Sequence, residues 1–327
     1  AGMKNMAKGL ALRMELRSAQ GDLKGSLEDL KLALNLAGKT AKGRTLIHQL
    51  VSIAVRSITY AQARRAASYH MKDARALQAF ADAMSEVDSE PQFAGALQGE
   101  AYMGIAVLRN KTLFQILREF SDTSMMEDYA DRPKQDPSKV VRDGDPKWML
   151  NRSLAVPFLA AWAEAGVIFQ KEGEGHVSVT KVGRLLQDKA DTGKGLGAMY
   201  LEVMFPVFSQ AGQAYTKTLA DEESTIAALR LAALKAKQGS VTPQDIKRLN
   251  PTDPFTGKPM GVKVTAKGVS VWSFGIDKKD DGGVVKADSD TLKVNAGKPL
   301  EQHRHDFTSQ IPWQPTQSAL KRAAAAP

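Results

Sequence analysis

Cysteine is absent from this chain of 327 residues. The chain therefore has no disulfide, no thiolate nucleophile and no cysteine-ligated zinc site. Its longest apolar runs, such as residues 154–166, are too short and too interrupted to span a bilayer. The lack of cysteine is compatible with a location outside the cytoplasm. The chain opens on Ala1-Gly2 rather than Met, which is compatible with a leader or a membrane anchor upstream of Ala1.

The motifs of common enzymes are also missing. There is no G-x-S-x-G elbow and no G-x-x-x-x-G-K-[ST] loop, and "GKGLG" at residues 193–197 is too loose for a phosphate cradle. Glu222-Glu223 precedes a helical run, and we interpret the pair as compensation of a helix dipole. The sequence therefore specifies no catalytic residue and no cofactor-binding residue.

Histidine and methionine offer few further candidates. The segment His303-Arg304-His305-Asp306 contains metal-ligating residue types, but it lacks the i, i+4 spacing of a helical metal site, which favours a solvated loop over a metal or acid/base site. His48 lies among apolar helix positions, which favours a core or interface histidine over a catalytic one. Met125-Met126 is interpreted as a local packing anchor, with a partner contact as the alternative.

Charge is plentiful but uneven. The formal net charge is +9, and residues 1–80 hold 14 Lys/Arg against 5 Asp/Glu, so this quarter accounts for all of it. Such asymmetry indicates either a solvated helical face or an anionic partner, which would be a polyanion, a nucleic acid or an anionic surface. No nucleic-acid-binding motif accompanies the charge.

The first 120 residues have the periodicity of amphipathic helices. In "GDLKGSLEDLKLALNLAGKT" leucines recur at helical spacing, Gly21-Asp22 predicts a turn before the helix, and Gly38 is a natural C-cap. With the preceding "LALRMELRSAQ", this predicts a helix, a turn and a helix. The pair resembles one tetratricopeptide hairpin, although no 34-residue repeat follows. Further helices are predicted at residues 43–67, 71–87, 91–120, 148–170, 196–219 and 222–238, and one strand-like stretch is "GHVSVT" at residues 175–180.

The C-terminal part has different signals. Thr242 followed by Pro243 predicts the start of a short helix, and "GVKVTAKGVSVWSFG" predicts a β-hairpin around residues 266–268. The expected fold is therefore mainly α, an irregular tetratricopeptide-like array of helical hairpins with a small α+β C-terminal module. The expected parts are a helical array (1–121), a linker or long loop (122–147), a helical continuation with a short strand (148–220), the α+β module (221–295) and an extended tail (296–327).

Two stretches carry a resemblance. "ALRLAALKAKQGSVTPQDIKRLNPTDPFTGKPMGVKV" with "VSVWSFGIDKKDDGG", and residues 21–54 with "TLIHQLVSIAV", resemble a family of large uncharacterised bacterial proteins from planctomycetes and their relatives. The C-terminal stretch is also similar to the end of the major pseudopilin of type II secretion, in which a long helix, a "DPWGNPY" turn and a short hairpin precede a calcium-binding acidic loop. Residues 253–255, 257–259 and 272–277 match that pattern, with Trp272 in place of Tyr and Lys278 in place of Gly.

The resemblance implies a calcium site, as a structural staple, at "WSFGIDKKDDGG". It would place the Phe274 carbonyl and the Asp277 carboxylate on the ion. The remaining ligands would be Asp288 and Asp290, or Asp280 and Asp281. Calcium takes several oxygen ligands at flexible geometry, which such a loop supplies. The alternative is a solvated acidic turn whose charge is offset by the lysines at positions 278, 279 and 286.

These observations favour a non-enzymatic structural or protein-interaction protein, exported from the cytoplasm, with a protein partner and a possible role for calcium in its tail module. One alternative is an enzyme of unrecognised class, a hydrolase, with its site in a cleft. The other is a polyanion or nucleic-acid binder that uses residues 1–80.

Overall fold

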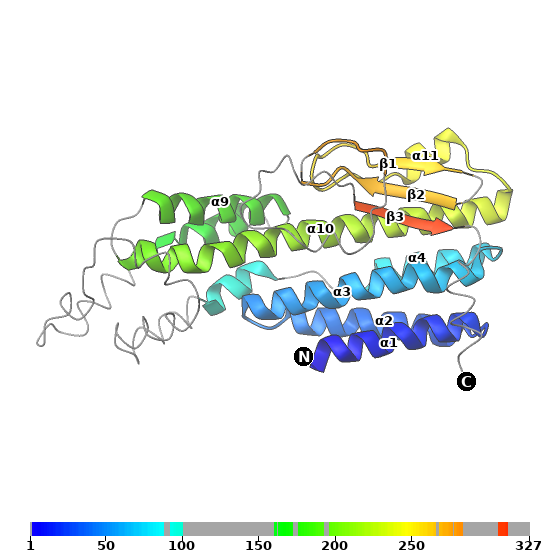
Figure 1. Ribbon diagram of the computed structural model, residues 1–327, viewed down its shortest axis with the longest axis horizontal. Helices are drawn as coiled ribbons and strands as arrows, with labels where there is room; N and C mark the ends of the chain where they lie inside the picture. The colour runs from blue at the N-terminus through cyan, green and yellow to red at the C-terminus, as the bar shows by residue number, and fades with distance from the viewer. Residues whose placement is uncertain are drawn as a thin grey trace, which may run out of the picture. The chain divides into compact units, whose positions relative to one another are not determined.

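The computed structural model describes residues 2–87, 92–100, 160–161, 163–172, 176–192, 196–265, 268–276, 278–283 and 307–312. Helices account for most of them, as the sequence predicts, and a small antiparallel sheet completes the regular structure (Figure 1). The chain divides into two compact units: unit 1 holds residues 1–43, 47–91 and 213–327, and unit 2 holds residues 44–46 and 92–212. Among the described helices, none is both long and apolar enough to cross a membrane.

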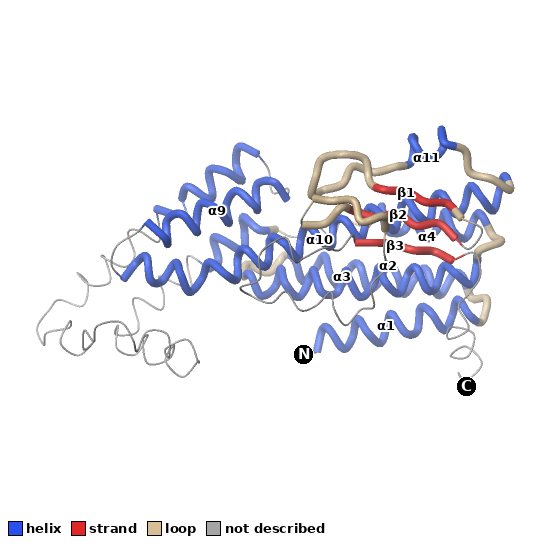
Figure 2. Tube along the Cα trace, turned by 45° about the horizontal axis from the view of Figure 1, so that its top comes forward, coloured by secondary structure: helices blue, strands red, loops and turns tan. Residues whose placement is uncertain are grey.

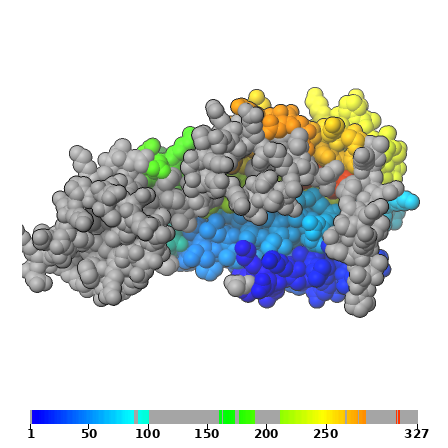
Figure 3. All heavy atoms as spheres, viewed as in Figure 1, coloured from blue at the N-terminus to red at the C-terminus, as the bar shows by residue number. Residues whose placement is uncertain are grey.

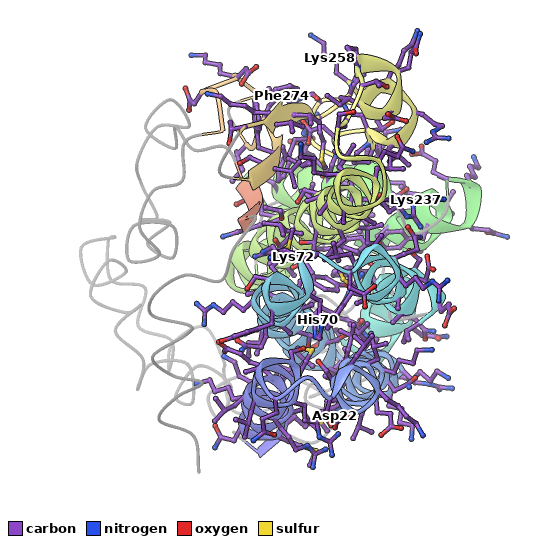
Figure 4. The ribbon with its side chains drawn as sticks, turned by 90° about the vertical axis from the view of Figure 1, so that its right-hand side faces the viewer. Asp22, His70, Lys72, Lys237, Lys258 and Phe274 are labelled. Carbon is purple, nitrogen blue, oxygen red and sulfur yellow. The ribbon has the colours of Figure 1, made fainter. Side chains whose placement is uncertain are left out.

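Unit 1 begins with four helices. They are α1 (Gly2–Ala19), α2 (Leu23–Ala41), α3 (Leu46–Ala67, with its first residue in unit 2) and α4 (Ala74–Glu86), and a 3-10 turn η1 (Ser68–His70) precedes α4. Figure 4 views these helices nearly end-on and shows α1 and α2 side by side as an outer layer, with α3 and α4 in the next layer. The N-terminal hairpin therefore forms one edge of unit 1.

The turn between α1 and α2 matches its sequence prediction. Gly21 has a φ of +81°, a left-handed conformation that glycine adopts without strain, and the Asp22 carboxylate accepts a hydrogen bond from the Gly25 N–H at 2.8 Å. The prediction of a C-cap at Gly38 is wrong, because α2 continues to Ala41. Gly38 is buried between Ala37 and Ala41, so the helix gains burial by continuing.

The long helix α10 (Leu196–Gln238) replaces two predicted helices at residues 196–219 and 222–238. Residues 213–238 contain neither glycine nor proline, so nothing in them ends the helix at position 220. It ends where Gly239 adopts a φ of +75°. The predicted start of α11 (Pro243–Leu249) is confirmed, with a capping box between Thr242 and Asp245.

Three strands follow: β1 (Gly261–Val264), β2 (Gly268–Ser273) and β3 (Phe307–Pro312). They form an antiparallel sheet in the order β1–β2–β3, and Figure 2 shows them side by side. The predicted hairpin is confirmed as β1 and β2, which pair from Gly261 with Trp272 to Val264 with Val269. The third strand lies in the segment predicted as an extended tail, where residues 307–312 pair with β2.

A single hydrophobic core links the two ends of the chain. Its fully buried members include Leu30 of α2, Leu77 of α4, Leu229 of α10, Val271 of β2 and Ile311 of β3. The predicted N-terminal array and the predicted C-terminal module thus share unit 1, and the units divide at other positions than the predicted boundaries. The predicted linker at 122–147 lies outside the described residues.

Unit 2 contributes α9 (His176–Thr192) and helical residues at 93–100 and 163–172. The first range lies within the helix predicted at 91–120, and the second continues two residues past the end of the helix predicted at 148–170. The strand predicted at residues 175–180 is wrong, because residues 176–180 form the first turns of α9. Val179, Val182 and Leu186 are buried at spacings of three and four, so the helical period extends beyond the six residues that suggested a strand.

Candidate functional site

The two motifs that resemble the pseudopilin ending meet at Asp253. This carboxylate is fully buried. Its Oδ1 accepts hydrogen bonds from the Ser273 hydroxyl at 2.5 Å and the Phe255 N–H at 3.2 Å. Its Oδ2 accepts from the Thr256 hydroxyl at 2.7 Å and the Phe274 N–H at 3.4 Å. Asp253 therefore fastens the Asp-Pro-Phe-Thr-Gly turn to the end of β2.

The acidic loop folds over Trp272. The Trp272 Nε1 donates to Asp280 Oδ1 at 2.9 Å, and the same oxygen accepts from the Gly282 N–H at 2.9 Å. The indole also lies against two glycines: a Cβ atom on Gly261 would come within 2.0 Å of the ring, and one on Gly283 within 2.6 Å. Gly283 has a φ of +68° as well, so glycine suits this position for two reasons. Asp280 has a structural role in covering Trp272.

The predicted calcium ligands are only partly described. Phe274, Asp280 and Asp281 belong to the described residues, and both of these carboxylates are exposed. Asp277, Asp288 and Asp290 lie outside them. Within the described ranges, no group of three or more histidine or acidic side chains is placed to hold a metal ion. One oxygen of Asp280 already accepts two hydrogen bonds, so the described part alone does not make a calcium site. The calcium site stays a prediction.

A buried ionic cluster joins α3 to α10. Arg56 is 1% exposed; its Nε donates to the Tyr60 hydroxyl at 2.9 Å and its Nη2 pairs with Glu222. Burial would lower the pKa of Arg56, but Tyr60 and Glu222 together raise it, so the guanidinium stays charged. Burial, and then the charge of Glu222, raise the pKa of Tyr60, so the phenol stays protonated. The sequence interpretation of Glu222 was wrong, because this residue lies inside α10 and not before a helix.

A second cluster fixes β3. Arg64 Nη1 donates to Asp221 Oδ1 and to Thr225 Oγ1, both at 2.6 Å. The buried Ser309 of β3 lies 2.6 Å from the Ser224 hydroxyl and 3.1 Å from that of Thr225. One serine of the C-terminal strand is therefore held by side chains of α10 and, at 3.3 Å, by Arg64 of α3.

These clusters are suited to holding elements together. A general acid or base must reach a substrate proton, whereas Arg56, Glu222, Arg64 and Asp221 are engaged with one another. Burial raises the pKa of the partly buried Glu223, the charge of Glu222 adds to this, and Arg230 opposes it. A raised carboxyl pKa alone does not identify an active site.

The outer layer of α1 and α2 differs from these clusters, because its charged residues are mostly exposed. Residues 1–42 hold eight Lys/Arg against four Asp/Glu, a net charge of +4. Large apolar side chains stand exposed among the charges: Met3 (44%), Met6 (57%), Leu12 (64%) and Leu32 (52%). Figure 3 shows the atoms of α1 at the surface of unit 1. We call these four apolar side chains, together with the lysines and arginines of residues 1–42, the outer face.

The remaining sequence candidates add no site. His48 was predicted in a core or interface; it is exposed, so the core prediction is wrong, and its ring lies over Gly43. The segments 125–126 and 303–306 lie outside the described residues. Sequence reasoning missed Asp253, Arg56 and Arg64. The available signal was an arginine inside the apolar run "SIAVRSITY", which calls for a buried partner.

Comparison with protein-family models, with curated proteins and with solved structures finds no match to this chain.

Proposed function

We propose that this protein acts by binding rather than by catalysis, as a structural or interaction protein that docks through its outer face. One observation carries the proposal. The buried ionisable side chains of α3 and α10 pair with one another, whereas Met3, Met6, Leu12 and Leu32 are left exposed among lysines on the outer layer. No specific observation among the described residues favours the hydrolase alternative.

The resemblances extend this proposal. The α1–α2 hairpin would be one tetratricopeptide-like element of an irregular helical array, and the segment around β1 and β2 would be a pseudopilin-like brace. The contacts of Asp253 support the second point, because they join the turn motif to the strand motif of that resemblance. A location outside the cytoplasm, with a protein partner there, belongs to the same proposal.

Calcium would act in this brace as a staple, with Asp277 as a ligand. The expected result is a higher midpoint of thermal unfolding with calcium than with excess chelator, because an ion that binds only the folded state stabilises it by mass action. The gain should be lost in Asp277→Ala and kept in Lys279→Ala. Identical unfolding curves for the wild type with and without calcium would leave the acidic segment as a turn that covers Trp272.

Site-directed cross-linking tests the docking proposal. Because the chain has no cysteine, single cysteines at Asn5 and Asn35, both exposed on the outer layer, can carry a thiol-linked photo-cross-linker. Ser240, exposed after α10, is the matched control position. In extracts of the cells that naturally make the protein, with their membranes retained, we expect covalent adducts from Asn5→Cys and Asn35→Cys and few from Ser240→Cys. Equal adducts from all three positions, or none, would refute the proposal.

A further inference from the structure

The cations of the outer face fall into two classes. The arginines of α1 pair internally: Arg13 Nη2 lies 2.6 Å from Asp29 Oδ1, and Arg17 Nη1 lies 3.2 Å from Asp29 Oδ2. Lys31 pairs with Glu86 of α4. The described residues show no ion pair for the other lysines of this layer, which are exposed: Lys4, Lys8, Lys24, Lys39 and Lys42. The charge available to a partner is therefore carried by lysine.

These lysines are spread along both helices. Lys4 and Lys8 lie in the first half of α1, Lys24 begins α2, and Lys39 is in the last turn of α2. Figure 4 shows the side chains of both helices projecting away from the layer of α3 and α4. Residues 2–41 contain no aromatic residue, so the apolar part of the face consists of methionine and leucine. The result is a dispersed pattern of flexible cations with aliphatic side chains between them.

We propose that the outer face docks on the surface of an anionic lipid bilayer. This inference rests on the proposed docking function and names its partner. Lysine is a flexible point charge, suited to diffuse attraction rather than to a fixed bidentate contact. Protein interfaces are instead enriched in arginine and aromatic residues and depleted in lysine. Proteins bind single-stranded nucleic acid through aromatic stacking and phosphate contacts, and the exposed Met6 and Leu12 contribute to neither.

A bilayer surface uses both parts of the pattern. Each lysine near an anionic leaflet adds to the attraction, while Met6 and Leu12 can enter the boundary between headgroups and acyl chains. The buried side of α1, with Ala7, Leu10 and Met14, stays in unit 1, so docking requires no unfolding. Because the face lacks an aromatic anchor, we expect weak binding that falls as salt screens the lysines.

Vesicle sedimentation with the full chain tests the inference. The probes are vesicles of phosphatidylcholine alone and of equal parts phosphatidylcholine and phosphatidylglycerol. We expect binding to the mixed vesicles at low salt, less at physiological salt, and little to phosphatidylcholine alone. The variant Lys4→Glu/Lys8→Glu should bind roughly tenfold more weakly or worse. The matched control is Lys237→Glu/Lys258→Glu, which makes the same change of charge at two exposed positions away from the outer layer (Figure 4).

The apolar variant Met6→Ser/Leu12→Ser decides between a bilayer and polyanions in general. The charge of this variant equals that of the wild type. If the outer face docks on a bilayer, its binding to vesicles should be several-fold weaker and its binding to heparin unchanged. Vesicle binding equal to that of the wild type would overturn the inference in favour of simple polyanion binding, as would equal losses in the control variant. No binding to mixed vesicles would also overturn it, while adducts to a protein in the cross-linking experiment would leave the docking function standing. Thermal unfolding of each variant confirms that it is folded.

Discussion

Unit 1 uses its positive charges in two different ways. At the junction of α3 and α10, Arg56 and Arg64 are largely buried and each has a carboxylate partner. On the outer face, Lys31 pairs with Glu86, and the other exposed lysines of α1 and α2 show no such partner among the described residues. The two groups contribute alike to the net charge of the first 80 residues, yet only the second is available to another molecule.

The difference has a physical basis. A charge that leaves water loses hydration energy, and only a close partner with good geometry offsets the loss. The planar guanidinium of arginine holds a carboxylate at fixed geometry and remains protonated, whereas a lysine keeps its ammonium group in water at the end of a flexible stem. The distribution therefore separates charges that hold the fold together from charges that can meet a partner. The predictions below test this separation, beginning with the largest effect.

The first prediction compares one inner cation with one outer cation. Arg56→Met leaves Glu222 with a buried, unpaired charge, so the free energy of unfolding should fall by roughly 3–5 kcal/mol. Lys24→Met, on the exposed face of α2, should change it by less than about 0.5 kcal/mol. Chemical denaturation of both variants measures the difference.

A double variant sharpens this comparison. Arg56→Met/Glu222→Leu removes both charges and keeps apolar volume, so it should recover most of the stability that the single variant loses. If Arg56→Met were no more costly than Lys24→Met, the ion pair would not be a structural link between α3 and α10.

Local signals explain what the sequence could predict. The turn at Gly21-Asp22, the cap at Thr242-Pro243 and the β1–β2 hairpin each depend on residues a few positions apart, and the structure has all three. The errors at Gly38 and at residues 175–180 came from windows too short to show that the helical period continues.

The inner clusters were beyond such signals because their members are distant in the chain. Glu222 lies 166 positions after Arg56, and Ser309 lies 245 positions after Arg64. A single sequence shows that Arg56 lies in an apolar helix, but it does not show which carboxylate pairs with this arginine. The acidic loop shows a similar limit: the resemblance implied a calcium site there, but no local signal indicated that Asp280 accepts a hydrogen bond from Trp272 or that Asp253, outside the loop, makes the buried contacts.

The second prediction extends the comparison to carboxylates. Asp253→Ala removes the acceptor for the hydroxyls of Ser273 and Thr256 and for two backbone N–H groups, so the free energy of unfolding should fall by about 2–4 kcal/mol. Asp281→Ala, at an exposed position of the acidic loop, should be close to neutral. Denaturation followed by tryptophan fluorescence measures both. Equal effects would mean that burial of Asp253 adds nothing to its role.

The third and smallest effect concerns His70, a half-buried residue beside Asp73. Its Nε2 is buried without a hydrogen bond in the described structure, and burial, opposed by Asp73, lowers its pKa below the ordinary value of 6.5. As the pH falls below about 6.5, the unfolded chain takes up a proton before the folded chain does, so stability present above this pH is lost. When the pH is lowered from about 7.5 to about 5.5, we expect the thermal midpoint of the wild type to fall by more than that of His70→Asn. Glu223 is common to both proteins, so its contribution cancels in this comparison. The control His48→Asn, at an exposed position, should follow the wild type. A His70→Asn profile parallel to the wild type would show that the half-buried imidazole takes up its proton without cost, and the contrast between inner and outer cations would then not extend to histidine.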